Sequence, residues 1–154
     1  MDLLSGVEFA VQLAFASVPQ ITTAELVALQ QQGATEVTVL DVRSAREFAV
    51  SHIPGARHFD GPASQFQVPK QGTVVLYCSV GYRSSDMAAQ LGKLHASAHT
   101  GQGHVRFVNL KGSLFRWALE NRPLVDSQGH ATHKVHGYNA TWAKLLPDDR
   151  VVLP

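Results

Sequence analysis

Cys78 is the residue in this 154-residue sequence whose surroundings best fit covalent chemistry. It directly follows the apolar run 73–77, and four residues separate it from Arg83. Within that short segment Gly81 lets the backbone curl without side-chain clashes. A curled loop at a helix N-terminus gathers N–H groups that stabilise an anion. Together with the charge of Arg83, this arrangement favours the thiolate of Cys78, which is the nucleophilic form.

The pattern of apolar residues predicts the elements that position this cysteine. Residues 73–77 are continuously apolar, as in a parallel strand covered on both faces. Strands are also expected over 37–41 and 105–110 and, shorter, over 57–59. Helices are expected over 3–18, 22–33, 44–49, 84–94, 112–121 and 140–146, with a turn at 53–56, a helical turn at 63–66 and a loop at 99–104. Thr22 with Glu25 forms a capping box, and Ser44, then Ser84 or Ser85, are the other expected N-caps.

The alternation of strands and helices predicts an α/β fold with a mostly parallel central sheet and helices on both faces. Ligands of such folds bind at the carboxyl ends of the strands, which is where Cys78 lies. A domain over residues 21–126 is expected, preceded by an amphipathic helix within 1–20 and followed by an extension, 127–154, that packs on it. The apolar start has no basic residue before it and contains Glu8, so it fits neither a signal peptide nor a membrane span.

Charge and composition argue against several classes of partner. The net charge is +1, which gives no electrostatic case for nucleic acid or a membrane surface. A single cysteine forms no intramolecular disulfide and suits a reducing compartment such as the cytoplasm. The spacing of His130, His133 and His136 invites a metal, but their segment has no helical apolar pattern. Neither a metal nor another cofactor is therefore expected.

Three segments, in this order along the chain, resemble the signatures of the rhodanese family. Residues 41–56 include Asp-Val-Arg and His-Ile-Pro-Gly-Ala, and residues 78–85 hold a cysteine, four residues and an arginine at a helix start. Residues 109–124 contain Asn-Leu-Lys-Gly-Ser followed by a tryptophan and Arg-Pro-Leu. The resemblance covers about residues 21–125, and three segments in family order are far more specific than any one of them.

The resemblance implies a single-domain sulfurtransferase that works in two steps. The thiolate of Cys78 takes the outer sulfur of a small anionic donor such as thiosulfate and becomes a persulfide. A thiophilic acceptor then removes that sulfur; the acceptor is cyanide in vitro and a thiol or a protein in vivo. The N–H groups of 79–83 are expected to stabilise the charge as an oxyanion hole does. The expected substrate-binding residues are Ser79, Val80, Gly81, Tyr82, Arg83 and Arg43.

The residues of the first segment, 41–56, are expected to have a mainly structural role. Asp41 ends a strand and is expected to accept bonds from backbone or arginine donors near the loop. Arg43 and Glu47 are four residues apart and are expected to pair, with contact between Arg43 and the donor as the alternative. His52 precedes Pro-Gly and is expected to be a hydrogen-bonded turn residue, because no second metal ligand has a suitable spacing.

Two other functions compete with sulfur transfer. Phosphatases and arsenate reductases also place cysteine and arginine around an oxyanion, but with one residue more between them, so the nest here is smaller. A sulfur carrier or protein-interaction module is the second alternative. The apolar N-terminus and the aromatic tail, with Tyr138 and Trp142, would then dock a partner. Tyr82 adds bulk to the loop and is expected to narrow the choice of donor.

Overall fold

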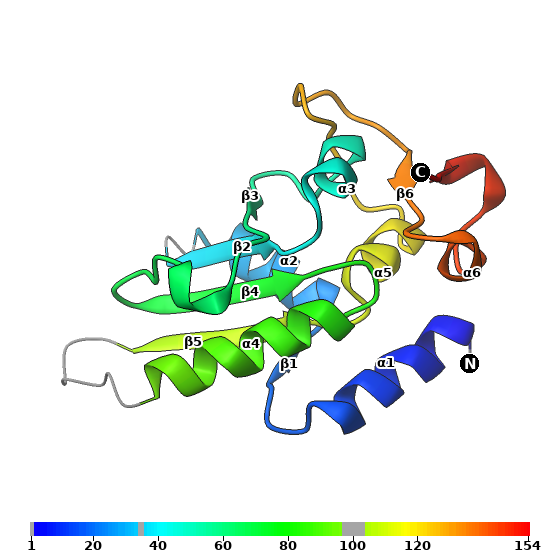
Figure 1. Ribbon diagram of the computed structural model, residues 1–154. Coiled ribbons are helices and arrows are strands. Elements are labelled where there is room, and N and C mark those ends of the chain that lie inside the picture. Colours follow the sequence, from blue (N-terminus) through cyan, green and yellow to red (C-terminus); the bar gives the residue numbers. More distant parts are fainter. Residues whose placement is uncertain (1, 34–35, 97–103) are drawn as a thin grey trace.

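The computed structural model describes residues 2–33, 36–96 and 104–154. Its centre is a parallel five-stranded sheet in the order β1-β5-β4-β2-β3 (Figure 1). The strands are β1 (Gln20–Ile21), β2 (Val37–Asp41), β3 (Arg57–His58), β4 (Gly72–Tyr77) and β5 (Val105–Leu110). A separate parallel pair is formed by β6 (Val135–His136) and β7 (Val151–Val152). The loop predicted at 99–104 lies almost wholly outside the described residues.

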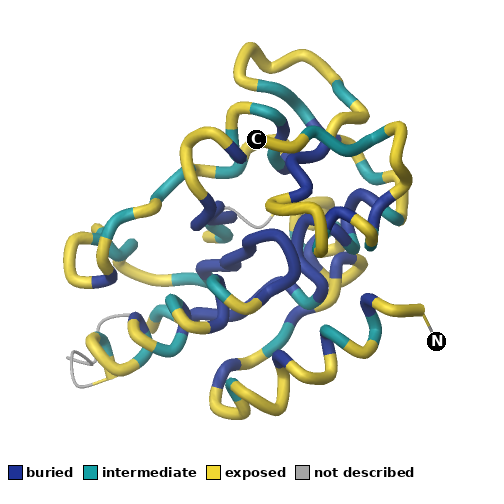
Figure 2. The backbone as a smooth tube through the Cα atoms, turned by 45° about the vertical axis from the view of Figure 1, so that its right-hand side comes forward, coloured by how far each residue is buried: buried dark blue, intermediate teal, exposed yellow. Residues whose placement is uncertain are grey.

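The middle strand β4 is buried on both faces, as its continuous apolar sequence predicts. Its side chains alternate between two apolar clusters because successive residues of a strand point to opposite faces. Val75 and Tyr77 lie in one cluster, whereas Val74, Leu76 and Cys78 lie in the other. Figure 2 shows this buried strand at the centre of the chain. The cysteine therefore follows the best-packed segment of the molecule.

Helices cover both faces of the sheet, which confirms the predicted α/β fold. Leu26 and Leu114 pack in the same cluster as Val75, and Ala88 and Leu91 pack on the opposite face. The helices are α1 (Leu3–Ala14), α2 (Thr23–Gln31), α3 (Ala45–Val50), α4 (Tyr82–His95), α5 (Ser113–Leu119) and α6 (Ala140–Ala143), with 3₁₀ turns η1 (Ala63–Gln65) and η2 (Asp148–Arg150). The predicted capping box at the start of α2 and the predicted N-cap Ser44 of α3 are confirmed, and Ser44 with Glu47 also forms a capping box that was not predicted.

The predicted N-cap of α4 is wrong. The helix begins at Tyr82, and its N-cap is Gly81 in the left-handed region, with φ at +113°. Ser84 and Ser85 lie inside the first turn, where the N–H of Ser85 donates to the carbonyl oxygen of Gly81 at 3.0 Å. Glycine reverses the chain directly into the helix and leaves no linker residue for a serine cap. The loop after Cys78 is shorter than predicted for this reason.

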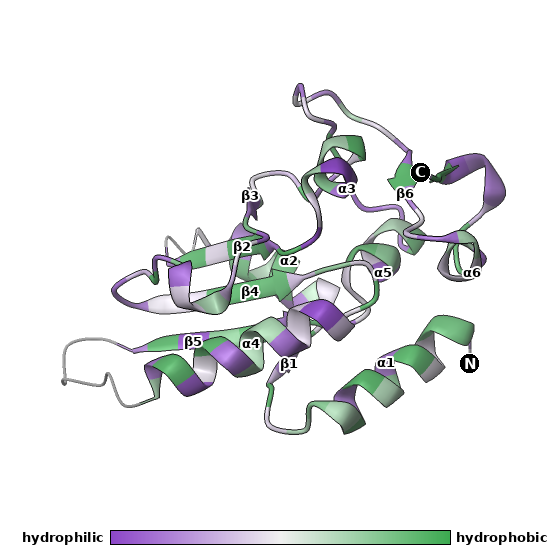
Figure 3. Cartoon of the chain, viewed as in Figure 1, coloured by the Kyte–Doolittle hydropathy of each residue, from purple (hydrophilic) through white to green (hydrophobic). Residues whose placement is uncertain are grey.

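Helix α1 packs on the domain but does not have the clean amphipathic pattern predicted for it. Leu4 and Val11 are buried against the domain. The other side exposes Leu3, Phe9 and Leu13, so apolar residues lie on both sides (Figure 3). None of the helices in the described parts of the chain has the length and apolar character needed to cross a bilayer.

The C-terminal extension is tied to the domain by backbone and side-chain contacts. Val125 forms bridges with both His52 and Ala131. The guanidinium of Arg150 donates to the carbonyl oxygen of Ala118, at the end of α5, at 2.6 Å. Val135 is fully buried in the main apolar cluster. These contacts hold α6 and the chain before it next to the carboxyl end of β4 (Figure 1).

Candidate active site

The sulfur of Cys78 lies at the start of a tight loop between β4 and α4. The N–H of Gly81 points at Sγ from 3.2 Å, and the hydroxyl oxygen of Ser84 lies 3.4 Å from it. Both groups are hydrogen-bond donors, and α4 begins just behind the sulfur with its positive dipole end. The predicted curled loop is present, and its donors suit a sulfur that carries negative charge.

Helix α5 holds this loop from behind. The N–H groups of Leu114 and Phe115 donate to the carbonyl oxygens of Cys78 and Ser79 at 3.1 and 3.0 Å. The hydroxyl of Ser113 accepts from the N–H of Cys78 at 3.3 Å and donates to the carbonyl oxygen of Leu110 at 3.0 Å. The first N–H groups of a helix have no partner within the helix. Here they fix the backbone that carries the nucleophile.

A polar chain extends from the sulfur to the edge strand β1. The hydroxyl oxygen of Ser84 is 2.6 Å from Oδ1 of Asn109, and Nδ2 of Asn109 donates to Oε1 of Gln20 at 2.8 Å. A hydroxyl has one proton, so Ser84 donates either to Asn109 or to Cys78 at any moment. The side chain of Ser84 can thereby respond to the charge on the sulfur.

Arg83 lies beside the loop and is bound by Glu47 of α3. Its Nη1 and Nη2 each donate to one carboxylate oxygen at 2.9 Å, and Nη2 also donates to the hydroxyl of Ser79 at 3.0 Å. Burial alone raises the pKa of Glu47, but the hydrogen bonds and charge of Arg83 outweigh it and lower that pKa to about 2. Burial likewise lowers the pKa of Arg83, but the hydrogen bonds to Glu47, together with the charges of Cys78, Glu47 and Tyr138, raise it above its ordinary value.

The predicted pairing of Arg43 with Glu47 is wrong, because Glu47 binds Arg83 instead. The guanidinium of Arg43 donates to both carboxylate oxygens of Asp41 and, at 2.7 Å, to the carbonyl oxygen of Ser51. Its side chain is fully buried. Bonds to Asp41 hold it below the surface, so the structure does not bring Arg43 to the pocket that a donor would enter. The prediction for Asp41 as an acceptor of arginine and backbone bonds fits this arrangement.

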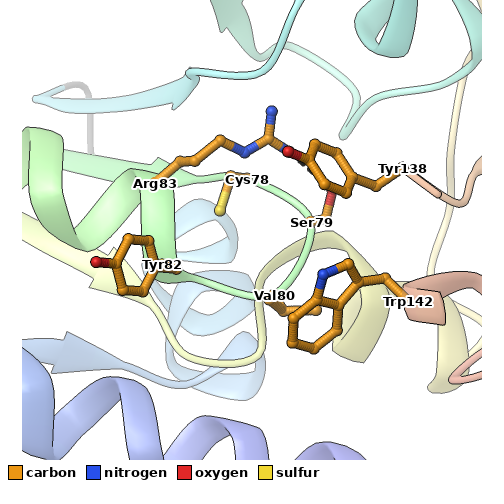
Figure 4. A pocket seen from close by; sticks show the side chains of 7 residues that line it. All are labelled: Cys78, Ser79, Val80, Tyr82, Arg83, Tyr138 and Trp142. Atoms are coloured by element: carbon orange, nitrogen blue, oxygen red, sulfur yellow. Dashed lines mark hydrogen bonds between the residues drawn. The ribbon is translucent and has the colours of Figure 1, made fainter.

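A cavity of about 160 Å³ opens over the cysteine. Figure 4 shows Arg83 extending toward Tyr138, whereas Trp142 lies beside Val80. The ring of Tyr138 lies over the guanidinium of Arg83, 4.7 Å from ring centre to the central carbon. The cavity is lined by Cys78, Ser79, Val80, Tyr82, Arg83, Tyr138 and Trp142. The last two were not predicted as site residues, although the aromatic content of the tail pointed to a packing or docking role.

The histidines singled out in the sequence do not gather around a metal. Nδ1 of His52 lies 2.9 Å from the carbonyl oxygen of Phe48, and its ring stacks on that phenyl ring. Nδ1 of His136 accepts from the N–H of Tyr138 at 3.0 Å, and burial lowers the pKa of His136. Among the described residues, no three His, Cys, Asp or Glu side chains are placed to hold a metal ion.

This arrangement is suited to nucleophilic chemistry on a small molecule. The cysteine provides the nucleophile, the Gly81 N–H and Ser84 hydroxyl stabilise charge on sulfur, and the cavity admits the reacting partner. Of the residues predicted to bind the substrate, Ser79, Val80, Tyr82 and Arg83 line the cavity, and the N–H of Gly81 lies 3.2 Å from the sulfur.

Known proteins resemble this chain in sequence and in fold. The model of the Rhodanese-like domain matches residues 22–120. A sulfurtransferase of Allochromatium vinosum is 32% identical over 97 residues, which are 61% of this chain and 83% of that protein.

Two solved structures share the fold over 92% of this chain at 18% identity. The BH2092 protein from Bacillus halodurans has a TM-score of 0.60, and 99% of it is covered. A thiosulfate sulfurtransferase from Pseudomonas aeruginosa has a TM-score of 0.58, and the chain spans 26% of it. At this identity the two structures establish the fold alone.

Proposed function

Because this chain belongs to the rhodanese family, we propose that it is a sulfurtransferase that carries sulfur as a persulfide on Cys78. One observation carries the proposal. The sulfur of Cys78 lies at a cavity and within 3.2 Å of the Gly81 N–H, in a loop that helix α5 fixes from behind. A sulfurtransferase relative supports transfer of sulfur in general, and the donor-rich loop supports the persulfide as its form.

The proposed reaction has two displacement steps. The Cys78 thiolate attacks the outer sulfur of thiosulfate, a new S–S bond forms, and the bond to the inner sulfur breaks so that sulfite leaves with the bonding pair. In the second step a nucleophilic acceptor attacks the outer sulfur of the persulfide and releases the thiolate. Cyanide gives thiocyanate in this step, and a thiol gives a new persulfide.

The residues around the cysteine have separate roles in this proposal. The Gly81 N–H and the Ser84 hydroxyl stabilise the negative charge on Sγ of the free thiolate, which is the form that attacks the donor and the form released at the end of the cycle. Arg83, held by Glu47, positions the hydroxyl of Ser79 at the cavity wall. A thiol that works as a nucleophile must stay reduced, so the proposed setting is a reducing compartment such as the cytoplasm.

The test is intact-mass measurement of the reduced protein after incubation with thiosulfate. We expect a gain of one sulfur atom that cyanide removes and that is absent in Cys78→Ser. Ser85→Ala is a matched control on the same helix, and it should load sulfur normally. A gain that persists in Cys78→Ser would overturn the assignment, as would hydrolysis of an aryl phosphate without any sulfur loading.

A sulfur carrier for a partner protein is the second candidate. The exposed apolar residues Leu3, Phe9 and Leu13 on α1 favour it, since such groups on one helix suit a protein contact. A carrier would accept sulfur from a protein persulfide much faster than from thiosulfate. Single-turnover loading rates with the two donors distinguish the carrier from the enzyme.

A further inference from the structure

The cavity over Cys78 combines an aromatic wall with a cation that is already neutralised. From this combination we propose that the preferred sulfur donor is an organic one, with a single negative charge, whose carbon group lies against Tyr138 and Trp142. Thiosulfonates and organic persulfides belong to this class. The inference rests on the proposed sulfur transfer and specifies its substrate.

The charge of Arg83 is engaged before any donor arrives. Both oxygens of Glu47 bind it at 2.9 Å, Ser79 takes a third hydrogen bond, and the ring of Tyr138 covers its face. Arg83 is the only cationic side chain among the described residues that line the cavity. With Glu47 beside it, the net charge at this wall is close to zero.

A neutral wall discriminates between donors by their charge. The cost of moving an ion out of water grows with the square of its charge, so a dianion such as thiosulfate loses far more hydration energy than a monoanion. The loop N–H groups can stabilise one negative sulfur, but the second charge of thiosulfate has no free cation to meet it. A monoanion suits this site better.

The aromatic wall has the size and character to receive a carbon group. The rings of Tyr138 and Trp142 and the side chain of Val80 line one side of the cavity. Its volume is about 160 Å³, and an apolar cavity of about 150 Å³ is enough to bind benzene. A donor that carries a phenyl-sized group can therefore fill the space that thiosulfate leaves empty.

The backbone of Tyr138 indicates that this wall has a function. Its φ is +70°, a left-handed conformation that is uncommon for a bulky residue. The N–H of Tyr138 is held by Nδ1 of His136, and this bond fixes the turn that places the ring over Arg83. Strain of this kind persists where surrounding contacts impose it, and it concentrates at ligand sites.

The chemistry of the step stays the same with an organic donor. The Cys78 thiolate attacks the terminal sulfur, the new S–S bond forms, and the bond to the donor's inner sulfur breaks. The leaving group takes the bonding pair as a sulfinate from a thiosulfonate, or as a thiolate from an organic persulfide. No oxidant or reductant is needed.

The test compares benzenethiosulfonate with thiosulfate, using cyanide as acceptor and the full chain. The readout is the ratio of kcat/KM for benzenethiosulfonate to that for thiosulfate, so any intrinsic difference between the donors cancels among variants. Trp142→Ala and Tyr138→Gly should each lower this ratio about tenfold, the loss expected for one aromatic contact. Glycine is comfortable at a positive φ, so Tyr138→Gly removes the ring without adding strain.

Two control variants distinguish the loss of an aromatic ring from a general disturbance of the fold. Tyr138→Phe keeps the ring and should keep the ratio, and Leu94→Ala, an exposed apolar residue on α4 outside the cavity, should also leave it unchanged. A ratio that stays constant in Trp142→Ala and Tyr138→Gly would overturn this inference but leave the Cys78 persulfide intact. If neither donor loads Cys78, the proposed function itself fails.

Discussion

Glu47 and Arg83 form a two-bond ion pair that joins helices α3 and α4 beside the cysteine, with both N–O distances at 2.9 Å. The carboxylate is 5% exposed and the guanidinium 34% exposed. Glu47 also accepts from the N–H of Ser44 at 3.2 Å and thereby completes the capping box of α3. The carboxylate of Glu47 therefore caps the N-terminus of α3, holds Arg83 at the cavity and neutralises the positive charge of Arg83.

The charge of Glu47 should contribute measurably to stability. Glu47→Gln keeps the shape and a side-chain oxygen for the cap but leaves Arg83 without its counter-charge. Because water reaches part of Arg83, we expect the free energy of unfolding at neutral pH to fall by about 1–3 kcal/mol, less than for a fully buried pair. Urea denaturation measures it. Asp86→Asn, an exposed carboxylate on α4, should change stability by less than about 0.5 kcal/mol.

The pKa of Glu47 sets the pH range in which the ion pair with Arg83 ceases to stabilise the protein. The pKa of Glu47 is about 2 in the folded state and has an ordinary value of 4.5. A lowered folded pKa stabilises the protein above the ordinary value and loses that effect as pH falls toward the folded one. The stability difference between the wild type and Glu47→Gln should therefore shrink as pH is lowered from 4.5 toward 2. A constant difference over that interval would contradict the assignment.

Ser84 and Ser85 are neighbours, but only the loss of the Ser84 hydroxyl is expected to slow the reaction. The hydroxyl of Ser84 lies 3.4 Å from the sulfur, whereas the buried hydroxyl of Ser85 finds no hydrogen-bond partner among the described residues. Ser84→Ala should slow persulfide formation about tenfold, because it removes a donor to a charged sulfur. Ser85→Ala should leave the rate unchanged and not lower stability. Single-turnover release of sulfite measures the two rates, and urea denaturation measures stability. Equal slowing in both variants would show that the Ser84 hydroxyl has no role beyond packing.

Gly112 and Gly33 form a matched pair at positive φ, at +74° and +66°. An alanine methyl group at Gly112 would overlap the carboxylate of Glu8 and Cβ of Arg116, but at Gly33 it meets no atom of the described residues within 4 Å. Gly33→Ala should cost about 1 kcal/mol, from left-handed strain alone. Gly112→Ala should cost about 3 kcal/mol or more, because the overlap adds to the strain.

Gly112→Ala should also affect the site, because the residue after it begins helix α5, which holds the Cys78 loop. We expect slower sulfur loading for Gly112→Ala and normal loading for Gly33→Ala. Urea denaturation and intact-mass loading measure the two effects. Similar losses of stability in both variants would show that the close approach of Glu8 and Arg116 to Gly112 has no energetic role.

Features fixed by local sequence were predicted well. The strands at 37–41 and 105–110 have the predicted bounds, the capping box at Thr22 forms as predicted, and Ser44 is the N-cap of α3 as predicted. Hydrogen bonds three residues apart and continuous apolar runs depend on neighbouring residues alone. The start of α4 was misplaced because serine is a common cap, and the sequence did not show that Gly81 would cap the helix with its backbone.

Contacts between side chains that are far apart in the sequence could not be predicted from it. Arg43 and Glu47 have an ideal helical spacing, yet each binds another charged residue, because Arg43 lies before the helix and Glu47 faces α4. Tyr138 reaches Arg83 across more than fifty residues of chain. The short strands β1, β6 and β7 were missed because two residues carry too little pattern to identify a strand.

The cavity is formed by two separate parts of the chain, the Cys78 loop and the C-terminal extension, and either can be substituted without the other. The loop of Cys78 is fixed by α5 within residues 22–120, which match the family model, whereas Tyr138 and Trp142 belong to the extension beyond them. Substitutions in the extension can alter what reaches the sulfur without disturbing the atoms that activate it. If the tail were exchanged for another, we would expect the donor preference to change while the nucleophile and its hydrogen bonds stay the same.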